Sequence, residues 1–181
     1  MLIAFAAFVL GALIAASVFG WSRWINDGRS PEPVWTEVAW PFPMDQWGKG
    51  KAFRCSASDC GTEVSVYVRA KIGFCNCATG VSDDAELDRI GDFDLFDGAA
   101  LPLAPGREIV VAWMKGRSRP FQIGAGRGGQ SGLLVGFNDR CDAIVATTVV
   151  GNDKPAAIEP AVIEFLNSRT VIRWAEVTLG L

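Results

Sequence analysis

The chain has 181 residues, a net charge of −3 and no histidine. This mild charge, without any basic run, argues against a nucleic-acid-binding protein. The absence of histidine excludes Ser-His-Asp and Cys-His catalytic groups as well as imidazole metal ligands. Thiol, carboxylate and cation chemistry remain, but no complete catalytic set is recognisable, so the sequence favours a protein that is not an enzyme.

The chain begins with an uncharged apolar segment. Residues 1–20 carry no charged side chain, and twenty residues at about 1.5 Å each span about 30 Å, the thickness of a bilayer's hydrocarbon core. Trp21 and Trp24 follow where an interfacial aromatic belt would lie. We expect residues 1–21 to form a transmembrane anchor. The alternative is a cleaved signal peptide with its small-residue cleavage site at 15–17.

The cysteines indicate which side of the membrane the remaining chain faces. Disulfides persist in oxidising spaces such as the periplasm, and the chain has five cysteines. Arg23 and Arg29 follow the span and would favour a cytoplasmic domain under the positive-inside rule, but two charges are a weak signal. The expected location is a bacterial inner membrane with the globular domain in the periplasm. If the first segment is cleaved, the domain is secreted.

Residues 22–50 are predicted to be a Pro/Trp-rich linker that lies against the domain. Its prolines exclude a continuous helix. Trp35, Trp40 and Trp47 would not normally remain in solvent, so we expect the segment to run extended across the domain and bury these rings. The alternative is an exposed aromatic docking strip.

Residues 51–181 are predicted to form a single globular, disulfide-bearing, β-rich domain. Apolar and polar side chains alternate over residues 64–74, which predicts a half-buried strand. Other β-rich runs lie at residues 108–114, 132–137, 143–150 and 170–179. Apolar residues at helical spacing predict a helix from about Pro160 to Asn167. The expected class is α+β: a mostly antiparallel sheet with one helix from the C-terminal half packed on it, preceded by the N-terminal transmembrane or signal helix.

The cysteines supply the candidate disulfide and metal ligands. Cys55 and Cys60 frame a short turn and are expected to form a disulfide. Cys75 and Cys77 lie two residues apart at the end of a strand, so their thiolates share one face and suit Cu(I) or Zn(II). With Cys141 they form the candidate metal site, and the pair also suits an exchangeable disulfide. The alternative is that one of the two bonds Cys141 while the other is buried or spare.

An acidic segment precedes a basic one. Seven of the twenty acidic residues fall within residues 83–97, but their spacing does not match an EF-hand calcium loop. The same carboxylates permit an acid–base enzyme, although no pair stands out. The basic residues expected to complement this segment within the fold are Lys115, Arg117, Arg119 and Arg127. The glycine-rich residues 124–129 precede a strand and are interpreted as a turn rather than a phosphate loop.

Together these features predict a membrane-anchored periplasmic domain that acts as an accessory or assembly partner of a larger envelope complex. Its partners would be the membrane, through the N-terminal helix, and a protein of that complex, without nucleic acid and without a cofactor. The alternative is a thiol-based copper-binding or redox protein that uses the pair Cys75 and Cys77.

Overall fold

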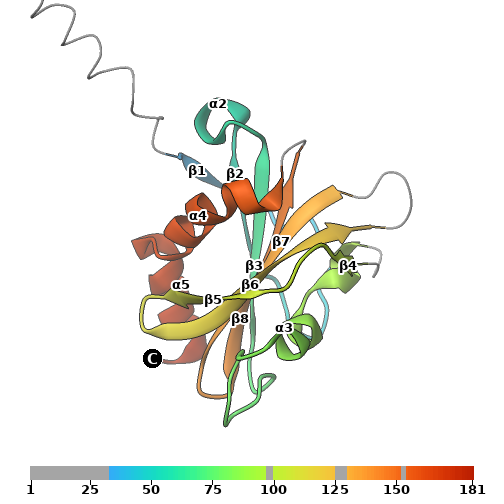
Figure 1. The fold of residues 1–181 in the computed structure, drawn as a ribbon. Helices are drawn as coiled ribbons and strands as arrows, with labels where there is room; N and C mark the ends of the chain where they lie inside the picture. Colours follow the sequence, from blue (N-terminus) through green and yellow to red (C-terminus); the bar gives the residue numbers. More distant parts are fainter. Residues whose placement is uncertain (1–32, 97–99, 125–129, 152–153) are drawn as a thin grey trace, which may run out of the picture. The chain divides into compact units, whose positions relative to one another are not determined.

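A computed structural model of the protein describes residues 33–96, 100–124, 130–151 and 154–181 (Figure 1). These residues belong to one structural unit, Pro33–Leu181. The strands are β1 (Trp35–Val38), β2 (Lys51–Cys55), β3 (Val64–Lys71), β4 (Ala100–Pro102), β5 (Arg107–Val111), β6 (Met114–Ile123), β7 (Gln130–Asp139) and β8 (Asp142–Val150). The helices are α2 (Ala57–Cys60), α3 (Asp84–Ile90), the 3-10 turn η1 (Phe93–Phe96), α4 (Pro155–Leu166) and α5 (Arg169–Leu179).

The predicted N-terminal transmembrane or signal helix lies outside the described residues, as does the start of the predicted linker. Within the described ranges, no helix has the length and apolar character needed to cross a bilayer.

The strands form a single antiparallel sheet, which confirms the predicted mostly antiparallel α+β character. Their order is β1-β2-β3-β8-β7-β6-β4, and β5 pairs with the first half of β6, beside the part that β4 covers. At the centre, β3 pairs with β8 so that Val64 faces Val150 and Lys71 faces Ala143. The alternation predicted for residues 64–74 is realised over β3.

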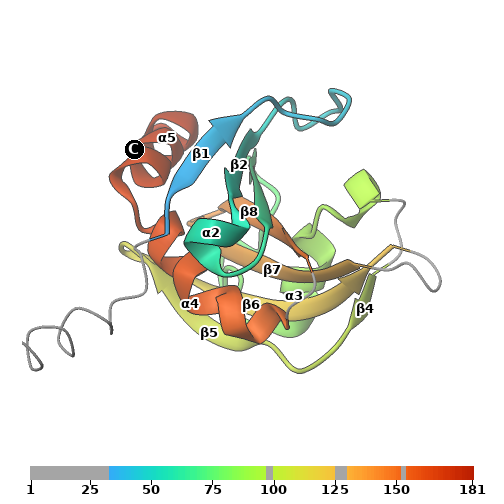
Figure 2. The same ribbon diagram turned by 90° about the horizontal axis from the view of Figure 1, so that it is seen from above.

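One face of the sheet packs on α4 and α5. Val64, Val66 and Val68 of β3 point to this side and are fully buried. Helix α4 contacts both ends of the sheet. Its Phe165 stacks on Trp35 of β1, with ring centroids 4.5 Å apart, while Glu159 forms an ion pair with Arg107 of β5. The sheet therefore curls around α4, as the view in Figure 2 shows.

The opposite face is covered by α3 and by the segments on either side of it. A second apolar cluster lies here, in which Leu87 and Ile90 of α3 pack on Leu134 and Phe121 of the sheet. The strands also present a set of cations to this side. They are Arg69, Lys71, Lys115, Arg117 and Arg119.

The C-terminal third contains two helices where the sequence predicted one helix and a strand. The first helix begins at Pro155 rather than near Pro160, which lies inside it. The strand predicted for residues 170–179 is wrong, because this segment is helix α5. Its start is capped by Ser168, and Val171 and Ala175 bury one face at helical spacing.

The run predicted as one strand at residues 108–114 is divided between two strands. β5 ends at Val111, and a two-residue turn, Ala112 and Trp113, leads into β6. The turn contains neither glycine nor proline, so its sequence gave no signal that the strand ends here.

Candidate functional site: a disulfide-pinned loop and the groove beside it

The loop between β3 and α3 is fastened to the turn between β7 and β8. A disulfide joins Cys77 of the loop to Cys141 of the turn. Beside it, the Cys75 N–H donates to the Cys141 carbonyl at 3.1 Å, and the Cys75 thiol donates to the Arg140 carbonyl at 3.2 Å. The Gly73 N–H also donates to the Asp142 carboxylate at 2.6 Å. These contacts fix the loop at the end of two central strands.

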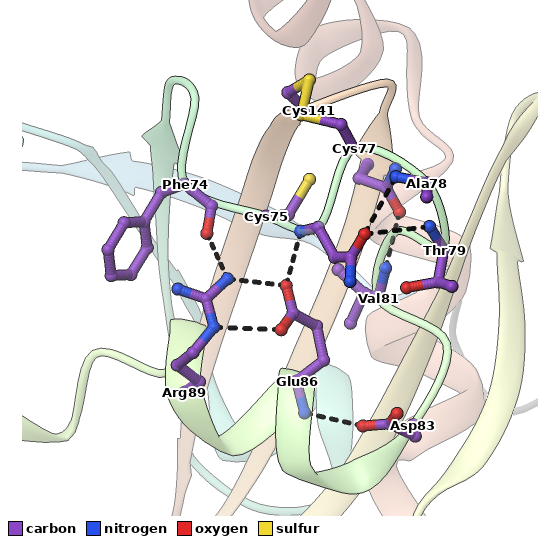
Figure 3. A network of polar contacts seen from close by, with 12 residues as sticks. Phe74, Cys75, Cys77, Ala78, Thr79, Val81, Asp83, Glu86, Arg89 and Cys141 are labelled. Carbon is purple, nitrogen blue, oxygen red and sulfur yellow. Dashed lines mark hydrogen bonds and ion pairs between the residues drawn. A yellow bond between two sulfur atoms is a disulfide. The ribbon is translucent and has the colours of Figure 1, made fainter.

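A polar network holds the same loop against α3 (Figure 3). Glu86 accepts the Asn76 N–H at 2.7 Å and forms an ion pair with Arg89, also at 2.7 Å. Arg89 donates in turn to the Phe74 carbonyl at 2.5 Å. The hydrogen bond from Arg89 is the main reason that the pKa of Glu86 lies below its usual range, with the Asn76 N–H contributing. Glu86 is therefore ionised at neutral pH and joins loop to helix.

The loop packs on β7 through Asn138. The Asn138 side chain accepts the Val81 N–H at 2.9 Å and donates to the Arg140 carbonyl at 2.9 Å. Gly80 has a left-handed backbone with φ of 63°, and a Cβ there would collide with the Asn138 side chain. Only glycine meets both requirements at this position. The residues that follow Gly80 in the loop are therefore held in one position against β7.

A groove lies between this loop and the β5–β6 hairpin. Its cavity volume is about 490 Å³, within the range of about 300–1,000 Å³ that small-molecule sites occupy. Its polar lining consists of Thr79, Ser82, Glu108, Lys115 and Asn138. Val81 and Val110 give it an apolar side. The lining thus combines hydroxyl groups, one cation and one carboxylate.

The five cysteines are placed as two disulfides and one thiol, which confirms that the chain forms disulfides. Cys55 bonds Cys60, with a sequence separation of 5, and Cys77 bonds Cys141 with a separation of 64. Cys75 is free and buried. This arrangement is the alternative in which one member of the Cys75 and Cys77 pair bonds Cys141 and the other is buried. A copper or zinc site of all three sulfurs would first require reduction of the Cys77–Cys141 bond, and it stays a prediction.

The remaining thiol has a low tendency to ionise. Burial raises the pKa of Cys75 to about 11, and the carboxylates of Glu86 and Asp142 act in the same direction. The thiolate is the form that binds soft metals and attacks disulfides, so Cys75 is weakly reactive at neutral pH. Among the described residues, no group of three or more acidic or cysteine side chains is placed to hold a metal ion.

The predicted complementarity of the acidic and basic segments is present for Arg117 and Arg119. Arg117 pairs with Asp84 at 2.8 Å, and Arg119 pairs with Asp88 at 2.6 Å. The pKa of Asp84 is lowered, first by the N–H of Gly106 and then by Arg117. Asp84 and Asp88 thus form ion pairs with arginines and are not arranged around a common point where a cation could bind. Asp97 and Arg127 lie outside the described residues, as do residues 125–129 of the glycine-rich turn.

A third charge group was not anticipated from the sequence. Arg69 and Lys71 both pair with Asp92, at 2.5 and 2.8 Å, and the three side chains are no more than 5% exposed. Asp45, from the segment between β1 and β2, accepts a third hydrogen bond from Arg69 at 2.7 Å, beside the two that Asp92 accepts. Trp40 of the same segment lies over the Arg69 guanidinium. Arg69, Lys71 and Asp92 are thus closed off from solvent, whereas Asp45 remains half-exposed.

The tip of the β5–β6 hairpin presents an aromatic side chain that the sequence did not single out. Trp113 is 51% exposed. The preceding Ala112 has a left-handed backbone with φ of 53°, which costs a non-glycine residue energy. Its N–H donates to the Asn167 side chain at 2.7 Å, and Asn167 also donates to the Val110 carbonyl at 3.5 Å. The end of α4 therefore holds the tip in its shape.

Comparison with known proteins gives no match. No family model, no curated protein and no solved structure is significantly similar to this chain.

Proposed function

We propose that this protein is a membrane-tethered extracytoplasmic domain that binds a protein partner, as an accessory or assembly component of a larger envelope complex. The apolar segment at residues 1–20 and the disulfides support the location. The observation that carries the binding function is Trp113, a large ring held half-exposed on a clamped hairpin tip.

The physical reason lies in the cost of that arrangement. A strained backbone persists only where surrounding contacts hold it, and such positions concentrate at sites of function. Tryptophan is enriched among the few residues that dominate the energy of protein interfaces. The ring of Trp113 therefore offers a partner a rigid, half-exposed aromatic surface at the hairpin tip.

Affinity purification of the tagged full-length protein after mild detergent extraction tests this proposal. We expect a stoichiometric partner whose recovery falls by about 30-fold or more in Trp113→Ala, since truncation of a hot-spot residue costs about 2 kcal/mol or more. The matched control is Val177→Ala on α5, because Val177 is 76% exposed and lies outside the hairpin. Recovery of a lone monomer, or equal recovery from both variants, would contradict the proposal.

The second candidate is a thiol-based copper-binding or redox protein. It is favoured by the position of Cys75, whose N–H donates to the carbonyl of Cys141, a residue whose sulfur is already in a disulfide. In that case Cys75→Ser and Cys77→Ser abolish Cu(I) binding or thiol exchange, whereas Cys55→Ser does not.

Alkylation of the unreduced protein separates the two candidates. The raised pKa of Cys75 predicts no modification of the native protein at neutral pH and one modification after denaturation. Its reactivity should increase as the pH rises from about 9 towards 11, because only the thiolate reacts. Three modified cysteines in the protein taken from its native envelope would instead favour the thiol candidate.

A further inference from the structure

The groove beside the cysteine loop contains two opposite charges that no described residue neutralises. Lys115 and Glu108 both line it, and neither has an ion-pair partner within the described ranges. Arg69, Lys71, Arg117 and Arg119 point to the same sheet face, and each of them is paired with an aspartate. Among the described strand cations on this face, Lys115 is the one without a carboxylate partner, and its side chain is exposed.

The strand register explains why these two groups remain apart. Val110 is the direct partner of Lys115, and Arg117 is the direct partner of Glu108. Glu108 and Lys115 are therefore diagonal neighbours on one face, with Cα atoms about 7–8 Å apart. Arg117 turns to Asp84 and to the Ser82 carbonyl and leaves Glu108 without a bond. The two charges thus stand at separate points of one cavity.

The opposite wall of the groove supplies hydrogen-bonding groups in fixed positions. Thr79 and Ser82 line it from the cysteine loop. The loop is held by the Cys77–Cys141 disulfide, by the Asn138 bond to Val81 and by Arg117, which donates to the Ser82 carbonyl at 3.2 Å. A wall that is already rigid loses little conformational entropy when a ligand binds.

We propose that this groove binds a small zwitterion of the amino-acid or short-peptide class. The ligand carboxylate is placed at Lys115 and the hydroxyl wall, its ammonium group at Glu108, and its apolar part on Val110. Both side chains are exposed and therefore hydrated, and a ligand with one charge would pair with only one of them. A ligand with both charges complements the pair and fits the cavity volume of about 490 Å³.

Calorimetric titration of the full-length protein in mild detergent tests the site, with L-leucine as the probe. Two analogues each lack one charge: 3-methylbutylamine lacks the carboxylate and 4-methylpentanoate lacks the ammonium group. We expect leucine to bind at least about tenfold more tightly than either analogue, which corresponds to about 1.4 kcal/mol. The dipeptide Leu-Leu tests the source of the ligand, and preference for either zwitterion supports the proposal.

Charge-neutral variants assign the binding to the groove. Lys115→Met and Glu108→Gln should each weaken leucine binding about tenfold or more, because each removes one of the two charge partners. Lys49→Met is the control, since Lys49 is exposed on the segment between β1 and β2. No heat of binding with leucine or Leu-Leu, equal affinity for leucine and 4-methylpentanoate, or an equal effect of Lys49→Met would overturn the proposal. None of these outcomes bears on the partner surface at Trp113.

Discussion

At the scale of single residues, the buried ionic group on β3 carries the largest energetic consequence. Asp92 is 3% exposed and is the shared partner of Arg69 and Lys71. Removing one member of a buried ion pair leaves an uncompensated charge in a medium of low polarity. Any substitution that neutralises Asp92 therefore leaves two cations with only the half-exposed Asp45 to balance them.

We expect Asp92→Asn to lower the free energy of unfolding by about 3–5 kcal/mol. Urea denaturation followed by tryptophan fluorescence measures this change. Asp94→Asn is the matched control, since Asp94 is exposed on η1 and forms no ion pair with a described residue, and its effect should stay within about 0.5 kcal/mol. Equal effects of the two variants would show that the buried group does not stabilise the fold.

The same residues show what an alternating pattern can predict. The alternation over residues 64–74 placed Arg69 and Lys71 on the polar face of a half-buried strand, and that face is correct. The pattern gives no information about what covers the face. Here α3 and the segment around Asp45 cover it, so the two cations are only 2% and 4% exposed.

At the scale of elements, helix α5 shows how end signals compete with strand propensity. The segment at residues 170–179 contains Thr, Val, Ile and Trp, which favour strands. Ser168 before it and Gly180 after it are residues typical of the two ends of a helix. In the structure Ser168 accepts the Val171 N–H, and Gly180 has a left-handed backbone with φ of 74°. Capping and one-sided burial therefore decide the conformation.

Removal of the N-cap should destabilise this helix measurably. Ser168→Ala is expected to lower the free energy of unfolding by about 1 kcal/mol, because the Val171 N–H loses its partner at the helix end. Far-ultraviolet circular dichroism during urea denaturation follows the loss. Ser168→Asp keeps an accepting oxygen at the cap and should stay close to the natural protein. If both variants unfold at the same urea concentration, the cap does not contribute.

The hairpin at residues 107–123 shows a different reason for a missed boundary. Its turn, Ala112 and Trp113, lacks the residues that ordinarily mark a two-residue hairpin. The conformation of Ala112 is instead supported by Asn167, which follows α4 and is distant in the sequence. A turn that depends on a tertiary contact has no local signal, so the exposed ring of Trp113 could not be located from the sequence.

At the scale of the whole molecule, the two disulfides close loops of very different length. Cys55–Cys60 spans a sequence separation of 5, whereas Cys77–Cys141 spans 64. A cross-link restricts the unfolded chain more strongly when the loop that it closes is longer. The bond that fixes the candidate groove should therefore also be the more stabilising one.

We expect the double variant Cys77→Ala with Cys141→Ala to lose about 4 kcal/mol of unfolding free energy, and Cys55→Ala with Cys60→Ala to lose about 2 kcal/mol, from loop-closure entropy. Guanidinium denaturation without a reductant measures both. Cys75→Ala retains both disulfides and controls for the loss of a buried thiol. A larger loss for the Cys55 and Cys60 variant would contradict the loop-length argument.

The candidate groove is formed by segments that are distant in the sequence and meet only in the folded protein. Its walls come from the cysteine loop, from the β5–β6 hairpin and from Asn138 of β7. The sequence identified the cysteines and the basic segment, and the acidic partners of Arg117 and Arg119 were expected. Thr79, Ser82 and Glu108 carry no motif, and they meet only because β6 lies beside β7 and the disulfide brings the loop over both.

The order of the strands also governs how the protein matures. β3 pairs with β8, which follows about eighty residues later in the chain, so the centre of the sheet closes only after nearly all of the polypeptide has emerged. Cys60 follows Cys55 by 5 residues, so this pair can form early. Cys77 is separated from Cys141 by 64 residues, whereas Cys75 lies only two residues from Cys77 and competes for it. Oxidation before the sheet closes therefore favours incorrect cysteine pairs. We expect thiol–disulfide exchange, in which a thiolate attacks an existing disulfide, to reopen such pairs before β8 joins β3.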